Sequence, residues 1–563
     1  MTTLSEQLKL AGYWLHLGNI NSAKALLLEI LQVHPHDLKA TELLAHIFTH
    51  QNNKTTAIEL LEKAASNPDC PPSVLLNLGD LYLESGQPQK AIGFYKATSN
   101  TGGEFFEALH NLGLAYTQLF QFEEATQAFQ KAISFNPNSF EAQINLGSCL
   151  KNLGQYEQSL NHLILAEKIA PNDARVFLNK GVTYEAMDQQ ENAINCYEKA
   201  IRLEPKYLEA YCNKANSLLA IGQHEKANIT FQKALSLNSS DADTLYNLSY
   251  LQLAEGNFKE GWKNYEYRWL RQNAPKKPFN AIPPLTSLEN LKNKNILIWA
   301  EQGLGDTIQF ARYISPLKKL GASITFAVQP HLAELMCTLD GINKIITTSD
   351  LAPPDSQFQA PLMSLPLLFE KANIPEPTGS PYLKSNSLKV DFWRSRLQNE
   401  RKLKVGLVWN GGFRPNQPGC WAVNARRNIP LSIIARLQNI RGIEFFSLQK
   451  GEPSESELTS HKSEIWPNNN LSIYTSELLN FSDTAGLIEN LDLVISVDTS
   501  TAHLAGALGK PVWILNRFDS CWRWMIQQEL THWYPTARIF NQPQPGNWES
   551  VITKVENELR TLV

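Results

Sequence analysis

The chain has 563 residues, of which 43% are hydrophobic and 19% are charged, so it is too long for one core and suits several globular domains. Its formal net charge of −4 argues against a general nucleic-acid binder, which needs a basic face. No apolar stretch approaches the roughly 18 residues that span a bilayer, and the first residues lack the pattern of a secretory signal. The seven cysteines are scattered without a CxxC pair, which predicts reduced thiols in a cytoplasmic protein and no zinc site.

The first half of the chain repeats with a period of 34 residues. Six asparagines mark this period: Asn77, Asn111, Asn145, Asn179, Asn213 and Asn247. Small residues such as Gly79 and Gly113 and large ones such as Tyr95 and Phe129 recur in the same frame, and prolines close several units. This is the tetratricopeptide pattern, in which each unit is a pair of antiparallel helices and stacked units form a superhelix with a concave groove. We predict an α solenoid of about eight repeats over residues 4–270.

The asparagine column is the functional signal within the repeats. An asparagine presents both a donor and an acceptor, so a spaced row of them is suited to the backbone of an extended peptide. We predict that the row binds an acceptor peptide in the groove; its members are Asn111, Asn145, Asn179, Asn213 and Asn247. The alternative is that these side chains only help the helices to pack.

A proline-rich segment follows the repeats, with Pro275, Pro278, Pro283 and Pro284 close together. Proline favours extended backbone and excludes helix. We therefore predict a connection over residues 271–292 that packs on the next domain.

Short apolar strands then alternate with helices, which predicts parallel sheets of the α/β class. The predicted strands are 295–300, 324–328, 344–347, 404–409, 445–448, 493–496 and 511–515, with a mixed helical stretch around 360–375 and a last helix at about 547–562 that is a candidate to cross back to the first half. Two such series predict two Rossmann-like domains, at 293–400 and 401–563. Their site is expected between them, at the carboxyl ends of strands.

The first candidate motif runs from Glu301 to Thr307, directly after a strand and at the start of a helix. Gly303 and Gly305 permit a tight turn and close approach of an acceptor, and the helix N-terminus suits an anion or a sugar. Asp306 has two interpretations, as the cap of the helix or as a general base that accepts the proton of an attacking hydroxyl. The third glycine of a dinucleotide motif is absent, because Ile308 occupies its place.

The second candidate motif follows the strand that ends at Ser496. Its hydroxyls and backbone N–H groups at a helix start form a cradle for a diphosphate; the donor-binding candidates are Asp498, Thr499, Ser500 and Thr501. His503 lies on the first turn of this helix and is a candidate to donate to a phosphate oxygen or to the substrate.

Further donor-binding candidates lie between the two motifs. Arg426 and Arg427 offer planar forks for diphosphate oxygens. After a strand, Gln449, Lys450 and Glu452 are candidates, with Lys450 for a phosphate and Glu452 for ribose hydroxyls. The segment Trp522-Arg-Trp524 either lines the acceptor side or only packs. The single Asp-x-Asp, at Asp241 and Asp243, lies between repeats, so we predict no metal and no cofactor.

Residues 300–312 and 498–511 resemble bacterial tetratricopeptide proteins whose C-terminal part is related to the heptosyltransferases, family nine of the glycosyltransferases. The overall layout is similar to that of O-linked N-acetylglucosamine transferase. The resemblance implies a GT-B fold, inversion without metal, Asp306 as the base, and Asp498, Thr499 and His503 in the donor motif. Arg427 is our first choice for the basic phosphate residue and Arg426 the second. Heptosyltransferases have no solenoid, which favours a protein acceptor over lipopolysaccharide.

We therefore predict a metal-independent, inverting glycosyltransferase that moves a sugar from a nucleotide-diphosphate donor to a protein or peptide held by the solenoid. Two alternatives stay open: a non-catalytic scaffold with a degenerate glycosyltransferase domain, and a glycosyltransferase with a glycan or lipid acceptor. The sequence leaves a homo-oligomer open as well.

Overall fold

The computed structural model describes residues 3–100, 105–349, 355–379, 381–397, 402–415 and 417–563. The chain divides into two compact units, Met1–Pro205 and Lys206–Val563. The unit boundary lies inside the predicted solenoid, so the last repeats belong to the same unit as the α/β region. The predicted junction between the two α/β domains, at residues 400 and 401, lies outside the described residues.

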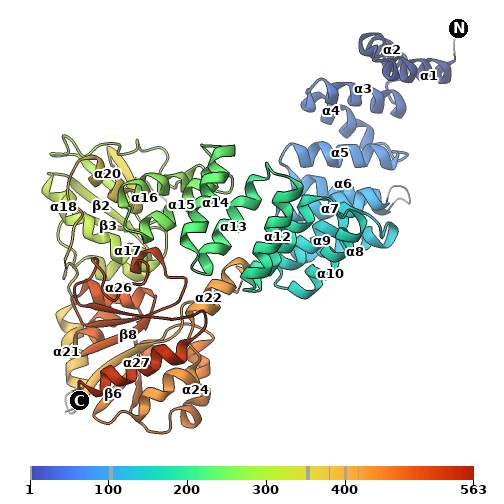
Figure 1. Ribbon diagram of the computed structural model, residues 1–563. Helices are drawn as coiled ribbons and strands as arrows, with labels where there is room; N and C mark the ends of the chain where they lie inside the picture. Colours follow the sequence, from blue (N-terminus) through green and yellow to red (C-terminus); the bar gives the residue numbers. More distant parts are fainter. Residues whose placement is uncertain (1–2, 101–104, 350–354, 380, 398–401, 416) are drawn as a thin grey trace. The chain divides into compact units, whose positions relative to one another are not determined.

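The first unit consists of antiparallel helix pairs, as the 34-residue period predicts (Figure 1). Its helices are α1 (Leu4–His16), α2 (Ile20–Val33), α3 (Leu38–His50), α4 (Lys54–Ala65), α5 (Pro72–Glu84), α6 (Pro88–Asn100), α7 (Phe105–Gln118), α8 (Phe122–Phe135), α9 (Phe140–Asn152), α10 (Tyr156–Ile169), α11 (Ala174–Ala186) and α12 (Gln190–Leu203).

The regular spacing of small and large residues has a direct packing reason. A Cβ atom on Gly79 would lie 2.6 Å from the ring of Tyr95, and one on Gly113 would lie 2.6 Å from the ring of Phe129. Both rings are fully buried. The glycine of the first helix in each pair therefore makes the space that the aromatic residue of the second helix fills, which confirms the predicted roles of these positions.

The second unit begins with the last repeats. Its helices there are α13 (Leu208–Ala220), α14 (His224–Leu237), α15 (Ala242–Ala254) and α16 (Phe258–Tyr265), followed by the short 3₁₀ helix η1 (Glu266–Trp269). The ring of Trp262 lies 5.6 Å from that of Phe310 and 5.3 Å from that of Trp522. Aromatic side chains from the last repeat and from both halves of the α/β region thus share one core.

The first sheet is parallel and has the strand order β3-β2-β1-β4. Its strands are β1 (Asn295–Trp299), β2 (Ser323–Val328), β3 (Lys344–Thr347) and β4 (Phe358–Pro361). The prediction of a helical stretch from about 360 was wrong at its start, because residues 358–361 pair with β1. The proline-rich segment packs on this strand as predicted, since Leu285 N donates to Gln359 O at 2.8 Å and Gln359 N to Pro283 O at 2.9 Å.

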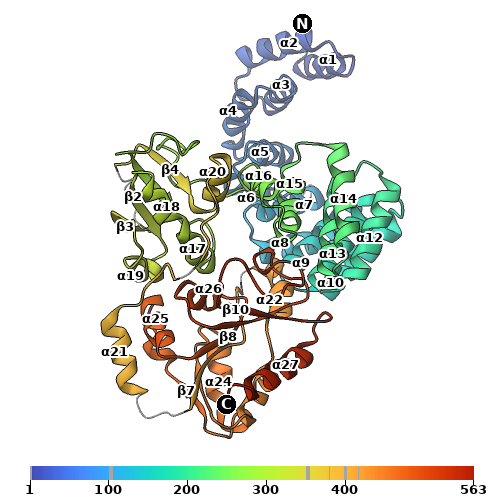
Figure 2. The same cartoon turned by 60° about the vertical axis from the view of Figure 1, so that its left-hand side comes forward.

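The second sheet is also parallel, with the order β10-β9-β8-β5-β6-β7. Figure 2 labels its strands β10, β8 and β7. Its strands are β5 (Leu403–Val408), β6 (Ile443–Ser447), β7 (Leu471–Ile473), β8 (Leu493–Val497), β9 (Val512–Asn516) and β10 (Ala537–Asn541). Three of these strands, β6, β8 and β9, are buried along their whole length, because parallel strands are covered on both faces. The α/β class predicted for the region after the solenoid is therefore correct.

Helices cover both sheets. The α-helices are α17 (Leu304–Phe310), α18 (Ile314–Lys319), α19 (Ala333–Met336), α20 (Leu365–Lys371), α21 (Ser387–Arg396), α22 (Trp421–Arg427), α23 (Leu431–Ile434), α24 (Ser454–Ile465), α25 (Phe481–Glu489), α26 (Ser500–Ala507) and α27 (Trp548–Arg560). The 3₁₀ helices are η2 (Ala311–Tyr313), η3 (Pro330–Leu332), η4 (Leu362–Ser364), η5 (Pro418–Cys420), η6 (Ala435–Asn439), η7 (Thr475–Glu477) and η8 (Trp522–Trp524). Among the described residues, no helix combines the length and the apolar character needed to cross a membrane.

Two helices lie elsewhere than the sequence suggested. The last helix, α27, packs against β10, α23 and η6 of the second sheet and does not return to the first. The helix α21 packs against α25 of the second sheet, where Asn490 Nδ2 donates to Val390 O at 3.0 Å. We call β1–β4 with α17–α20 the first lobe, and β5–β10 with α22–α27 the second lobe.

Candidate functional site

The two candidate motifs meet where the first turns of α17 and α26 touch. Each helix follows the carboxyl end of a central parallel strand, β1 in the first lobe and β8 in the second. A Cβ atom on Gly305 would lie 2.9 Å from His503 Cδ2 and 3.4 Å from Ser500 Cα. Both ribbon views show the two helices side by side (Figure 1, Figure 2). The glycine therefore permits the two lobes to approach to backbone contact at this point.

Asp306 lies at this contact. Its Oδ2 accepts a hydrogen bond from Gly303 N at 3.0 Å, which confirms that it caps α17. Its Oδ1 is paired with Arg523 Nη2 from η8 of the second lobe. The side chains are only 18% and 12% exposed, respectively. Each carboxylate oxygen keeps a further lone pair, so capping and a role as base are compatible, but the base role stays a prediction.

The sequence analysis named Arg523 only within the segment Trp522-Arg-Trp524, as a candidate to line the acceptor side, and did not single out its charge. Burial lowers the pKa of Arg523, but Asp306, Cys521 and Asp498 outweigh it and hold the pKa well above its ordinary value. The guanidinium also donates through Nη1 to Cys521 Sγ at 3.0 Å. A fixed cation thus lies between two carboxylates at the junction of the lobes.

His503 is buried between aromatic and acidic partners. Its Nδ1 lies 3.0 Å from the hydroxyl of Tyr534, its Nε2 lies 3.9 Å from Asp498 Oδ1, and its ring stacks on Trp524 with 4.9 Å between centroids. Burial, together with Arg523 and Arg312, lowers the pKa of His503 to about 3, although Asp498 opposes the shift. At neutral pH the imidazole is uncharged and acts only through hydrogen bonds.

Asp498 remains an anion at the start of α26. Burial raises its pKa, but His503 first, and then Arg427, Arg523 and Arg517, outweigh burial and leave the pKa below its ordinary value. Three arginines therefore lie near the single negative charge of Asp498. Their positive charge favours the binding of an additional anion.

Arg427 is the arginine with spare hydrogen-bonding capacity. Its Nη1 donates to Asp498 O at 3.2 Å and its Nη2 to Asn424 Oδ1 at 2.7 Å, while its buried Nε has no partner in the part of the chain that the structure describes. Its guanidinium covers Gly411, where a Cβ has no room. Burial first, then Arg517 and Arg414, lowers its pKa. By contrast, Arg426 forms an ion pair with Asp519 at 3.0 Å.

The hydroxyl residues lie at the N-terminus of α26, as predicted. Thr499 is the residue before the helix and its Oγ1 lies 2.9 Å from Ser496 Oγ. Ser500 and Thr501 form the first turn, whose N–H groups have no partner within the helix. Thr501 is buried, whereas Thr499 and Ser500 are half-buried.

The three candidates after β6 bond to other partners than Asp498 and Arg427, and Gln449 bonds to Asn410, the residue before Gly411 that Arg427 covers. Gln449 holds a turn, since its Oε1 accepts from Trp409 N at 3.1 Å and from Asn410 N at 2.9 Å. Lys450 Nζ donates to Thr475 O at 2.6 Å, and Glu452 accepts from Ser456 N at 3.4 Å. Within the described ranges, none of the three contacts Asp498 or Arg427, so the geometry supports a structural role for Gln449.

The amide nitrogens of the asparagine column are mostly used within the repeats. In the first unit, Asn111 Nδ2 donates to Asp80 Oδ1 at 2.8 Å and Asn179 Nδ2 to Arg175 O at 2.9 Å, and Asn145 Nδ2 lies 3.1 Å from His110 Nε2. In the second unit, Asn247 Nδ2 donates to Cys212 Sγ at 3.2 Å. Asn213 is half-buried. The packing interpretation is thus supported, and peptide binding stays a prediction.

The repeat region defines the class to which the first half of the chain belongs. Models of the tetratricopeptide repeat match residues 15–73, 74–101, 106–139 and 174–207, and a further model of the same repeat matches 128–161 and 196–227. The N-terminal region therefore consists of tetratricopeptide repeats, which gives the chain the capacity to bind other proteins.

One curated relative is Protein FlbA of Caulobacter vibrioides, which is 28% identical over 334 residues. The match covers 55% of this chain and 53% of that protein, so the chain spans about half the length of this relative.

Solved structures also match the chain. YrrB, described as a TPR protein with an unusual peptide-binding site, is 23% identical, with 33% of this chain and 95% of that chain covered and a TM-score of 0.31. MamA of Desulfovibrio magneticus is 26% identical, with 30% and 96% covered and a TM-score of 0.29. A tetratricopeptide repeat protein of Parabacteroides merdae is 24% identical, with 44% and 98% covered and a TM-score of 0.36.

Proposed function

We propose that the protein is a metal-independent, inverting glycosyltransferase of the GT-B type, which moves a sugar from a nucleotide diphosphate to a protein or peptide held by the solenoid. The observation that carries the proposal is the junction of the lobes. There Asp306 of the first lobe is paired with Arg523 of the second, and the neighbouring Gly305 lies against His503, which is itself 3.9 Å from Asp498. Ligands of parallel α/β folds bind at the carboxyl ends of strands, where these residues lie.

The charges at the junction suit a diphosphate leaving group. Arg427 Nε has no hydrogen-bond partner among the described residues. Arg427 Nη1 donates to the carbonyl of Asp498, which is two residues before Ser500, the first residue of α26. Guanidinium groups and helix N-termini stabilise phosphate oxygens without proton transfer. The electron pair of the breaking bond between the sugar carbon and the phosphate oxygen would thus go to a group already neutralised by the protein.

The carboxylate of Asp306 provides the other half of the reaction. In a single displacement, the acceptor oxygen or nitrogen forms a bond to the anomeric carbon as the diphosphate leaves on the opposite face, so the configuration inverts. The proton of the acceptor goes to Asp306. His503, uncharged at neutral pH, contributes a hydrogen bond to the substrate and not a charge.

A panel of nucleotide sugars tests the proposal. UDP-, GDP- and ADP-linked hexoses and heptoses are added to the full chain, and the melting temperature and the release of free nucleoside diphosphate are measured. We expect at least one donor to raise the melting temperature and to release diphosphate when an acceptor protein is present. No stabilisation and no release across the panel would refute the proposal.

The second candidate function is a non-catalytic scaffold, which the tetratricopeptide repeats support directly. In that case the α/β region binds no nucleotide, and calorimetry with UDP, GDP and ADP shows no heat. A third candidate keeps the chemistry but uses a glycan or lipid acceptor, with the solenoid serving assembly, including assembly of a homo-oligomer. The seven free cysteines fit our proposal that the reaction takes place in the cytoplasm.

A further inference from the structure

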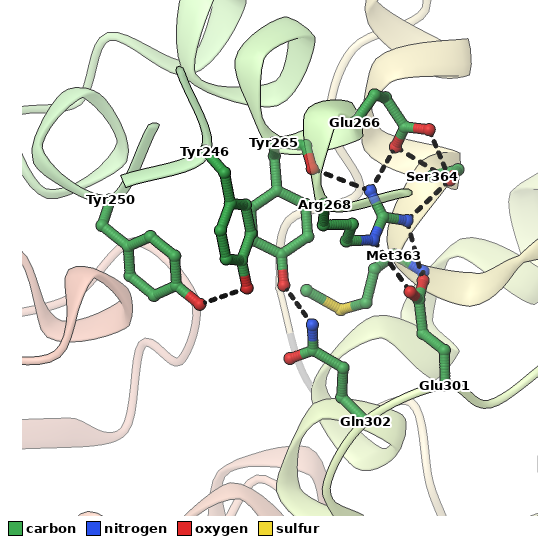
Figure 3. Close-up of polar contacts among 9 residues, drawn as sticks. All are labelled: Tyr246, Tyr250, Tyr265, Glu266, Arg268, Glu301, Gln302, Met363 and Ser364. Atoms are coloured by element: carbon green, nitrogen blue, oxygen red, sulfur yellow. Dashed lines mark hydrogen bonds and ion pairs between the residues drawn. The ribbon is translucent and has the colours of Figure 1, made fainter. Parts of the chain in front are cut away.

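The loop that leads to Asp306 is held by an arginine of the last repeat (Figure 3). Arg268 in η1 donates through Nε to Glu301 Oε2 at 2.8 Å and through Nη2 to Glu301 Oε1 at 2.9 Å. The two side chains are only 6% and 3% exposed. A bidentate pair with so little water around it fixes both the distance and the orientation of the carboxylate.

Every N–H group of the Arg268 guanidinium has a partner. Nη1 donates to Tyr265 O at 3.1 Å and to Glu266 Oε1 at 2.7 Å, and Nη2 also donates to Ser364 Oγ at 2.8 Å. With the two bonds to Glu301, all five donors of the fork are used. Burial lowers the pKa of Arg268, but Glu301 and Glu266 outweigh it and raise the pKa, so the group stays a cation.

The next residue of the loop is anchored as well. Gln302 Nε2 donates to the hydroxyl of Tyr265, also from the last repeat, at 2.5 Å, and Gln302 O accepts from Gln329 Nε2 at 2.8 Å. Glu301 Oε1 accepts in addition from Met363 N at 3.0 Å. The two residues that precede Gly303 are therefore held from three directions, as Figure 3 shows for Tyr265, Arg268 and Met363.

The hydrogen bonds that hold Glu301 and Gln302 also affect the position of the Asp306 carboxylate. Gly303 directly follows the anchored pair, and its N–H donates to Asp306 Oδ2 at 3.0 Å. The position of Gly303 thus sets the direction in which Asp306 points toward Arg523. Small displacements of a reacting group carry large kinetic costs, on the order of 10²-fold for about 1 Å.

We propose that Arg268 is a positioning residue for Asp306, so that the last tetratricopeptide repeat is a built-in part of the reaction site and not only a recruiting surface. The role of Asp306 in this inference rests on the proposed function; the anchoring of the loop does not. A purely structural role of the Arg268–Glu301 pair is the competing explanation.

The test uses the double variant R268M/E301Q in the full-length chain. The single variant R268M would leave the Glu301 charge buried without a counter-ion and is at risk of misfolding. The double variant removes both charges, and the glutamine keeps an oxygen for Met363 N. The matched control is R436M, which breaks the ion pairs of Arg436 with Glu549 and Glu556 on the second lobe. Hydrogen exchange, affinity for UDP, GDP or ADP, and the single-turnover transfer rate are measured.

We expect exchange of the amides of residues 301–306 to become at least about tenfold faster in R268M/E301Q, without a matching change in β8 and α26. The transfer rate should fall by roughly 10- to 100-fold while affinity for the nucleoside diphosphate stays within about twofold. R436M should change neither quantity. Unchanged exchange at 301–306, an unchanged transfer rate, or faster exchange throughout the α/β region would each overturn the inference. If the wild-type chain transfers no sugar at all, the proposed function fails, and the exchange measurement still decides whether Arg268 holds the loop.

Discussion

Gly305 and His503 lie in contact across the two α/β lobes, and the absence of a side chain on the glycine is what permits this contact. A Cβ there would lie 2.9 Å from His503 Cδ2, closer than real side chains approach. The histidine cannot move away easily, because it is stacked on Trp524 and bonded to Tyr534.

Gly305→Ala therefore should push the lobes apart at the site. We expect a loss of about 1–3 kcal/mol in the free energy of unfolding and a fall of at least about tenfold in transfer rate. Urea denaturation and the donor assay measure the two effects. Gly412→Ala is the matched control, since a Cβ at Gly412 meets nothing within 4 Å. Wild-type behaviour of Gly305→Ala would show that the contact has no role.

Asp306→Asn tests the base directly. The amide can still accept the hydrogen bond from Gly303 N, so α17 keeps its cap, but it cannot take a proton. We expect the transfer rate to fall by roughly 10²–10⁴-fold with nucleotide affinity largely kept. Asp391→Asn, at an exposed pair with Arg394, serves as the control. Transfer at the wild-type rate would remove Asp306 from the mechanism.

Arg427 and Arg426 are predicted to differ although they are neighbours in the sequence. Arg427→Ala should weaken nucleoside diphosphate binding by roughly 10- to 100-fold, the loss expected for charge-assisted hydrogen bonds. Arg426→Ala should affect affinity less, because its guanidinium is already paired with Asp519. Isothermal calorimetry with UDP, GDP and ADP gives the comparison, with exposed Arg441→Ala as control. Equal losses at both positions would contradict this assignment.

His503 should make the folded protein sensitive to acid. Its pKa is about 3 when folded and near 6.5 when unfolded, so between these values only the unfolded chain binds the proton. The contribution of His503 to the free energy of unfolding is therefore fully present above about pH 6.5. It decreases as the pH falls below that value, by at most about 5 kcal/mol. Urea denaturation of wild type and His503→Gln at pH 7.5 and 5 should show a smaller loss in the variant. An identical loss in both would refute the prediction.

The asparagine column is tested by replacing Asn145, Asn179 and Asn213 together with alanine. If the row binds peptide, modification of a protein acceptor should fall by at least about tenfold. Hydrolysis of the nucleotide sugar by water and the affinity for the nucleotide should stay unchanged. A variant that only loses thermal stability, with normal modification of the acceptor, would support packing. Circular dichroism on the same samples separates the two outcomes.

The 34-residue repeat and seven of the ten strands in the described residues could be predicted from the sequence, whereas β4, β7 and β10 were missed. The 34-residue period shows which residues must be small and which large, as Gly79 and Tyr95 confirm, because helix pairing in a solenoid depends on neighbours close in the chain. The buried runs of β1 and β8 and the polar turns after them are also local signals, so the amino-acid pattern alone is enough to single out Asp306 and the Thr499–Thr501 turn.

Which of these residues lie in contact could be seen only from the packing of the two lobes. Arg523 is 217 positions from its partner Asp306, and nothing near Arg523 in the sequence marks it as the cation of the site. The same holds for Arg268, whose local pattern reads as the end of a helix but whose guanidinium holds Glu301 of the next domain. Likewise, the bonds that Gln449 Oε1 accepts from Trp409 N and Asn410 N have no signal in the sequence, and its predicted role in donor binding stays a prediction. Pairing between distant side chains depends on how lobes pack, and a single sequence contains no period or spacing that reports it.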